Sequence, residues 1–168
     1  FLVTGPEMVI AACRSGVMGC FPATNARTEE DLRHWVDRIA TGVTAEDAPW
    51  AMNMITHSSY GRFDAELALV AEFRPGLVIT ALGGPHRVTD TVHGYGGLVF
   101  ADVNSPTYAR KAIDKGADGL VLVCSGAGGH TGEYAMMPFV DEVRRFFDGP
   151  LIVGGGIGTG RAVRAVET

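Results

Sequence analysis

The stretch Leu151–Arg161, which reads LIVGGGIGTGR, joins an apolar β-type run, a glycine-rich loop and the start of a helix. An apolar run this short, ending at glycine, is typical of a buried strand rather than of a core helix. A strand followed at once by a loop and a helix is the βα unit from which parallel sheets are built. The stretch therefore predicts an α/β fold.

Five similar apolar runs precede this unit along the chain. They are Val17–Phe21, Trp50–Ile55, Leu77–Leu82, Leu98–Val103 and Gly119–Cys124. Helical patterns separate the runs, at Thr28–Ile39, Asp64–Phe73, Val88–Tyr95, Ser105–Lys115 and Pro138–Phe147. Six strands that alternate with helices indicate a parallel sheet, which is either an open doubly wound sheet or a closed TIM (β/α)8 barrel. Periodicity alone does not choose between the two.

Two of these helices carry clear start signals. Thr28 and Asp31 have the spacing of a capping box, in which each side chain accepts a hydrogen bond from the other residue's backbone N–H. Ser105 is a suitable N-cap, and Pro106 after it has the backbone angle of a first helical turn. Gly116 is expected to end the helix that Ser105 begins.

Length and charge limit the classes of protein that are possible. The chain has 168 residues, of which 46% are hydrophobic and 20% charged, and its net charge is −5. This composition fits one globular domain and argues against disorder. No basic run is present for nucleic acid, and no apolar stretch approaches the roughly 18 to 20 residues that span a bilayer. We expect a cytoplasmic protein that binds neither nucleic acid nor membrane.

The glycine-rich loop after the last strand is a candidate phosphate site. Gly154, Gly155 and Gly156 lack a Cβ, so their backbone N–H groups can approach an anion closely. A plain tight turn would need about one glycine. A Rossmann dinucleotide site is the other alternative, but it follows the first strand of its unit and needs an acidic residue on the next strand. The pattern favours a mononucleotide such as FMN.

A second glycine-rich loop, CSGAGGHTGE at residues 124–133, presents His130. A neutral imidazole is the side chain best suited to act as a base near physiological pH, and small neighbours let it stand over a flat cofactor. The alternative is an ordinary surface histidine. The other histidines lack such a frame and have no metal-ligand spacing, so no metal site is predicted; they are His34, His57, His86 and His93.

The three cysteines form no C-x-x-C pair, so neither a disulfide framework nor a zinc ribbon is expected. Cys13 and Cys20 are interpreted as small core residues. Cys124 ends the strand before the histidine loop and is a candidate for the wall of a cofactor pocket.

Four segments occur together in an order that matches a known family. They are Gly116–Gly119 (GADG), Ala127–His130 (AGGH), Leu151–Ile157 (LIVGGGI) and Gly160-Arg161. This combination resembles the nitronate monooxygenase family, formerly called 2-nitropropane dioxygenases. More weakly, Glu7–Gly19 resembles the family's first helix and second strand, and Ala51–Asn53 resembles its third strand.

The resemblance implies a TIM barrel that holds FMN without a covalent bond. The six predicted strands are then strands two to seven of the eight, and residues 1–168 are a single FMN-binding barrel domain that is incomplete at both ends. A closed barrel needs eight strands, because a partial one leaves sheet edges exposed.

The resemblance also implies roles for individual residues. His130 is the catalytic base that removes the α-proton of a neutral nitroalkane, and dioxygen is the second substrate. The FMN phosphate is bound by Gly154, Gly155 and Gly156. Further FMN contacts come from Asn53, Asp102, Gly128 and Gly129. Asp102 stands where some relatives carry Lys, which changes the charge beside the flavin.

Two other functions stay open at this point. One is an FMN reductase that uses NAD(P)H, of the quinone or enoyl-acyl carrier protein type, because such enzymes belong to the same family. The other is a non-redox barrel whose glycine loop binds another phosphorylated ligand. The sequence also leaves open whether the chain forms a homo-oligomer.

Overall fold

The computed structural model describes residues 2–167, and its six parallel strands form one sheet. The strands are β1 (Gly19–Pro22), β2 (Trp50–Ile55), β3 (Leu77–Ala81), β4 (Leu98–Val103), β5 (Gly119–Val123) and β6 (Leu151–Gly154). The helices are α1 (Pro6–Arg14), α2 (Glu29–Gly42), α3 (Phe63–Phe73), α4 (His86–Gly94), α5 (Pro106–Asp114), α6 (Met136–Arg144) and α7 (Gly160–Val166), with a 3-10 turn η1 at Ala23–Asn25. All six predicted strands are confirmed.

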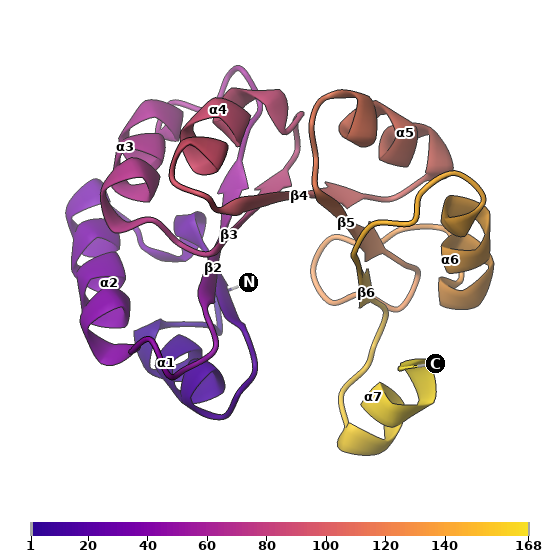
Figure 1. Cartoon of the computed structure of the whole chain (residues 1–168), viewed down its shortest axis with the longest axis horizontal. Coiled ribbons are helices and arrows are strands. Elements are labelled where there is room, and N and C mark those ends of the chain that lie inside the picture. The colour runs from indigo at the N-terminus through magenta and orange to yellow at the C-terminus, as the bar shows by residue number, and fades with distance from the viewer. Residues whose placement is uncertain (1, 168) are drawn as a thin grey trace.

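Strand order decides between the two α/β architectures. Each strand pairs with the one that follows it in the chain, in the order β1-β2-β3-β4-β5-β6. A doubly wound sheet reverses its strand order at a switch point, and this sheet does not. The strands curl into a half-barrel with the helices outside, and Figure 1 shows the open side between α1 and α7. The prediction of a partial TIM barrel is confirmed.

The predicted helix starts are largely confirmed. The Asp31 backbone N–H donates to Thr28 Oγ1 at 3.0 Å, and the Thr28 N–H donates to the Asp31 carboxylate at 3.2 Å. Ser105 caps α5, because its Oγ accepts from the Tyr108 N–H at 3.3 Å. The predicted bounds of α6 are wrong. This helix begins at Met136 rather than Pro138 and ends at Arg144 rather than Phe147.

Alternate residues of each strand face outward to the helices or inward to the barrel. The outward side chains form two buried clusters, one under α1 to α4 around Phe21 and Met52, the other under α5 and α6 around Leu120 and Phe139. A smaller inner cluster consists of Ala51, Leu77, Ile79 and Phe100. Both faces of the sheet are therefore apolar, as is usual for parallel strands covered by helices. No helix in residues 2–167 has the length and apolar character needed to cross a membrane.

Candidate active site

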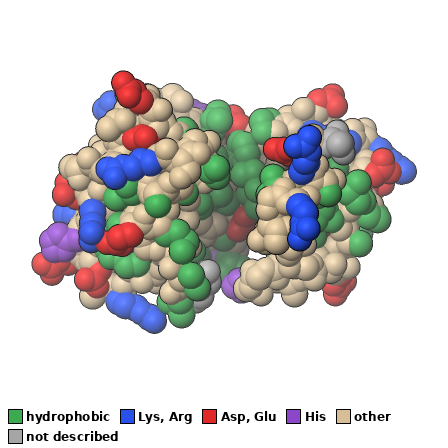
Figure 2. Space-filling view, turned by 90° about the horizontal axis from the view of Figure 1, so that it is seen from below, with side chains coloured by type: hydrophobic (Ala, Val, Ile, Leu, Met, Phe, Trp, Pro, Cys, Tyr) green, Lys and Arg blue, Asp and Glu red, His purple; other side chains and the backbone are tan. Residues whose placement is uncertain are grey.

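A cleft of about 1560 Å³ opens at the carboxyl ends of the strands. Figure 2, which looks into the open side of the half-barrel, shows a hollow lined largely by hydrophobic side chains. The sequence-predicted site residues all line this cleft. They are Asn53, Asp102, Gly128, Gly129, His130, Gly154, Gly155 and Gly156.

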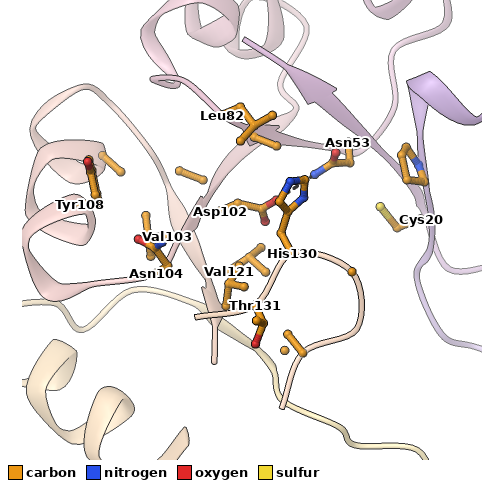
Figure 3. A pocket seen from close by; sticks show the side chains of 18 of the residues that line it. Cys20, Asn53, Leu82, Asp102, Val103, Asn104, Tyr108, Val121, His130 and Thr131 are labelled. Atoms are coloured by element: carbon orange, nitrogen blue, oxygen red, sulfur yellow. Dashed lines mark hydrogen bonds between the residues drawn. The ribbon is translucent and has the colours of Figure 1, made fainter. Parts of the chain in front are cut away.

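The central polar pair of the cleft joins two strands that are not neighbours. Asn53 lies near the end of β2 and Asp102 near the end of β4, and both side chains point into the barrel. The Asn53 Nδ2 donates a hydrogen bond to Asp102 Oδ2 at 3.1 Å. Figure 3 shows the Asp102 carboxyl group, the Asn53 amide and the His130 ring directed toward the same space.

Burial in this apolar wall shifts the ionisation of Asp102. Desolvation raises the pKa of its carboxyl group from 3.8 to about 6, while the hydrogen bond from Asn53 and the charge of His130 act in the opposite direction. The carboxylate form is costly because few polar groups replace the water that it loses. Asp102 therefore changes its charge close to neutral pH.

Hydrogen bonds to backbone carbonyl groups close the histidine loop at its base. The Ser125 N–H donates to the Tyr134 carbonyl at 2.9 Å, and Thr131 Oγ1 donates to the Cys124 carbonyl at 3.1 Å. Between these anchors Gly129 adopts a φ of +78°, which L side chains rarely accept. The reversal there directs the exposed His130 ring over the cleft (Figure 3).

The two glycine loops pack directly against each other. The Cys124 N–H donates to the Gly154 carbonyl at 2.8 Å, which continues the β5–β6 pairing past the strand end. A Cβ placed on Gly126 would lie 2.7 Å from the Gly155 carbonyl oxygen, too close for any side chain. The histidine loop and the predicted phosphate loop are thus held side by side through backbone contact.

Cys20 packs against the inner core cluster, as expected, and it also lines the cleft, which was not expected. The interpretation of Cys124 as a pocket residue is wrong. Cys20 lies on the inward face of β1 and lines the cleft, as Figure 3 shows. Burial, with a smaller contribution from the charge of Asp102, raises the pKa of its thiol to about 12. Cys124 is buried under α6, on the outer face of the sheet, whereas Cys13 is a core residue as expected.

Three polar residues of α5 and its C-terminal cap line the cleft without having been predicted as site residues: Tyr108, Lys111 and the C-cap residue Lys115. They face the β3–α4 loop, whose residues Leu82–Pro85 line the same part of the cleft. The signal available in the sequence was the i, i+4 spacing of the two lysines, which places both on one face of a helix.

The other four histidines lie outside the lining of the cleft. His57 Nδ1 is hydrogen-bonded to Ser59 Oγ at 2.7 Å, and His93 Nε2 contacts the Asp118 carboxylate at 2.8 Å. His34 is exposed on α2, and His86 begins α4. Their interpretation as ordinary helix and loop residues agrees with these positions.

A parallel barrel wall with polar and glycine-rich residues gathered at its carboxyl ends is the site arrangement of TIM-barrel enzymes. The family model for nitronate monooxygenases matches residues 3–168. The chain therefore belongs to the nitronate monooxygenase family, which is a family of oxidoreductases.

Individual relatives agree with this family. The chain is 25% identical, over 97% of its length, to the (3aS,4S,5R,7aS)-5-hydroxy-7a-methyl-1-oxo-octahydro-1H-indene-4-carboxyl-CoA dehydrogenase of Rhodococcus jostii, of which it covers 44%. FabK from Thermotoga maritima superposes with a TM-score of 0.83 at 26% identity, over 96% of this chain and 50% of FabK. The nitroalkane oxidase of Streptomyces ansochromogenes superposes with a TM-score of 0.85 at 21% identity, over 98% of this chain and 58% of the oxidase, and shares the fold. The chain thus spans about half the length of these relatives.

Proposed function

We propose that the protein is an FMN-dependent oxidoreductase that acts on nitronates or neutral nitroalkanes with dioxygen, and that His130 is its catalytic base. One observation carries the proposal: His130 lines the same cleft as the hydrogen-bonded pair Asn53–Asp102 and the Gly154–Gly156 loop. Membership of the nitronate monooxygenase family supports the same reaction class.

The residues of the cleft fit FMN. Gly156 has a φ of +78°, and the backbone of Gly155 lies against that of Gly126. Because the residues 154–156 are all glycine, this part of the loop presents only backbone to the cleft. Such a surface suits a phosphate that is bound by N–H groups. The cleft measures about 1560 Å³ along the open side of the half-barrel, above the roughly 300 to 1000 Å³ of most small-molecule pockets. In this proposal the phosphate is bound by Gly154, Gly155 and Gly156, and the ring system is contacted by Asn53, Asp102, Gly128 and Gly129.

FMN bound there would accept electrons from the substrate and deliver them to dioxygen. The residues of the chain position the substrate and move its proton. His130 accepts the α-proton of a neutral nitroalkane and becomes an imidazolium. The Asp102 carboxylate favours this cation because the two groups interact electrostatically across the cleft. Asn53 holds the carboxyl group in place through its hydrogen bond.

Apolar side chains complete the space around these polar groups. The apolar residues that line the cleft include Ile55, Leu82, Val121 and Val123. A ligand that fills the cleft displaces water from these side chains. A low-polarity surrounding strengthens the electrostatic interaction between Asp102 and the imidazolium. An alkyl chain on the nitro compound would contact this apolar wall.

The test is the variant His130→Asn in the full-length, FMN-loaded protein. Turnover of neutral nitroethane should fall by about 10² to 10⁴, because a positioned base contributes a factor of this size. Turnover of the preformed ethyl nitronate should change much less, since that anion needs no proton removal. His57→Asn, which replaces a histidine outside the cleft, is the matched control and should leave both rates unchanged.

Equal losses with nitroethane and with its nitronate would assign His130 to binding rather than to proton transfer. Full activity of His130→Asn on nitroethane would refute the catalytic role. Protein that shows no flavin absorption after reconstitution with FMN would refute the cofactor assignment.

A second candidate function is favoured by two of the relatives. One of them is a carboxyl-CoA dehydrogenase, and FabK is 26% identical, which exceeds the identity with the nitroalkane oxidase. The candidate is an NAD(P)H-dependent FMN reductase on the same barrel. Anaerobic spectra separate the two functions. Loss of the flavin band on adding nitronate supports the monooxygenase, and loss on adding NADH or NADPH supports the reductase.

A further inference from the structure

The cleft contains both lysines of the chain. The sequence has two lysines, Lys111 and Lys115, and both line the part of the cleft between α5 and the β3–α4 loop. The twelve arginines are outside the lining. Both lysine side chains of an acidic chain thus lie at one wall of the cleft.

Lys111 lies in the last turn of α5, and Lys115, four residues on, is the C-cap residue of the same helix. A spacing of four residues separates their positions by about 6 Å along the helix axis, a distance that one phosphate or pyrophosphate group can bridge. Across the cleft, the Lys115 chain reaches the β3–α4 loop, since a Cβ on Gly84 would lie 3.2 Å from Lys115 Cδ. Lys111 Nζ lies 5.4 Å from the centre of the Tyr108 ring, which is also exposed at this wall (Figure 3 labels Tyr108).

The charges of the lysines are not neutralised within the protein. In residues 2–167 neither lysine forms an ion pair, whereas Arg33, Arg38, Arg62 and Arg145 each contact a carboxylate. The one carboxylate in the lining is Asp102, which is hydrogen-bonded to Asn53 on the inner wall. Although the protein carries a net charge of −5, this part of its cleft is positive.

This positive wall is separate from the glycine-rich phosphate loop. The lysines are on the helix after β4, whereas the Gly154–Gly156 loop follows β6, and β5 lies between these strands. A nitroalkane has no anionic group that would reach from His130 to α5. A ligand that uses both regions must carry phosphate at a distance from its reacting group.

We propose that Lys111 and Lys115 form a phosphate-binding subsite for the adenosine pyrophosphate tail of a second ligand, with the reactive end of that ligand directed toward His130. Two classes of compound carry such a tail, namely a coenzyme A thioester as substrate and a nicotinamide dinucleotide as hydride donor. Lysine ammonium groups bind phosphate as point charges, and the Tyr108 ring offers an adjacent surface for stacking. The inference rests on the proposed function in one respect, namely that this cleft is the redox site, and the ligand that it adds belongs to the second candidate function rather than to nitroalkane oxidation.

The test is calorimetric binding to the full-length, flavin-loaded protein, with coenzyme A, NADPH, NADH and pantetheine as probes. The double variant Lys111→Gln/Lys115→Gln should weaken binding of the phosphate-bearing probe by at least about tenfold, because contacts to a charged group are lost. Binding should weaken with added KCl in the wild type and less so in the variant. Lys111→Arg/Lys115→Arg should keep the affinity.

Arg110→Gln is the matched control. It removes one positive charge from the same helix at a side chain that stacks on Phe146, away from the cleft, and should leave binding unchanged. Pantetheine lacks the pyrophosphate, so its affinity should be the same for the double lysine variant and for the wild type.

Lysine-dependent binding of coenzyme A alone identifies a thioester substrate, and lysine-dependent binding of NADPH or NADH alone identifies the hydride donor. Either supports the subsite. Failure of all phosphate-bearing probes to bind at millimolar concentration, or binding that the double variant leaves unchanged, overturns it. The flavin spectrum and nitronate turnover report separately on the proposed function, so the two can fail independently.

Discussion

Replacing Asp102 by Asn measures the cost of placing a carboxylate on the apolar wall of the cleft. Burial raises the pKa of this group from 3.8 to about 6 in the folded protein. Because the folded-state pKa is raised, Asp102 imposes no cost on folding below pH 3.8, where it is neutral in both states. The stability that the neutral form contributes is then lost progressively as the pH rises through about 6. Two pKa units at about 1.4 kcal/mol each give about 3 kcal/mol, and water at the open side lowers this toward about 2 kcal/mol.

Asp102→Asn is therefore expected to raise the free energy of unfolding by about 2 to 3 kcal/mol at pH 7.5 relative to wild type, and by much less at pH 4. The variant amide oxygen can still accept the hydrogen bond from Asn53. Urea unfolding of both proteins at the two pH values gives the difference. Asp90→Asn, which removes a carboxylate from the exposed surface of α4, is the matched control. A stability difference that is the same at pH 4 and pH 7.5, or a variant less stable at pH 7.5, would refute the reasoning.

Three further substitutions test the loops and the core. Gly126→Ala places a Cβ 2.7 Å from the Gly155 carbonyl oxygen, so FMN affinity should fall at least about tenfold in flavin titrations; unchanged affinity would mean that the loops move apart freely. Ser105→Ala removes the hydroxyl group that accepts a hydrogen bond from the Tyr108 N–H, so the free energy of unfolding in urea should fall by about 1 kcal/mol. An unchanged free energy of unfolding would mean that water replaces the cap equally well. Phe139→Ala leaves a cavity at a fully buried position of α6, so the free energy of unfolding in the same assay should fall by about 3 to 5 kcal/mol. A fall of less than about 1 kcal/mol would show that α6 collapses onto the cavity.

The strands were predictable because each is an apolar run of the right length, and several of the runs end near Gly or Pro. The choice of barrel over open sheet was not, since it depends on strand order, which periodicity does not carry. It came from the family resemblance, and the pairing of each strand with its successor agrees with it.

The start of α6 was misplaced because Pro138 was interpreted as its first residue. Pro138 is the third residue of the helix, after Met136 and Met137. A proline is tolerated there because the first four N–H groups of a helix have no partner within it. Proline thus marks the first turn but does not fix the first residue.

The inward direction of Cys20 could not be predicted from its strand. In a parallel sheet covered by helices both faces are apolar, so the alternation that would separate inside from outside is missing. Asn53 and Asp102 were predicted as cleft residues because the family resemblance implies flavin contacts at these positions, and both line the cleft. Their mutual hydrogen bond was not predicted, because β3 lies between their strands.

The position of Cys20 has a consequence for the chemical durability of the protein. A thiol reacts with oxidants and alkylating agents through its thiolate, and a pKa of about 12 leaves roughly one molecule in 100,000 in that form at pH 7. The charge of Asp102 contributes to this protection, so the carboxylate that adjoins His130 also keeps a neighbouring sulfur unreactive. Cys20 therefore lines the cleft without offering a reactive thiolate for sulfenic acid formation.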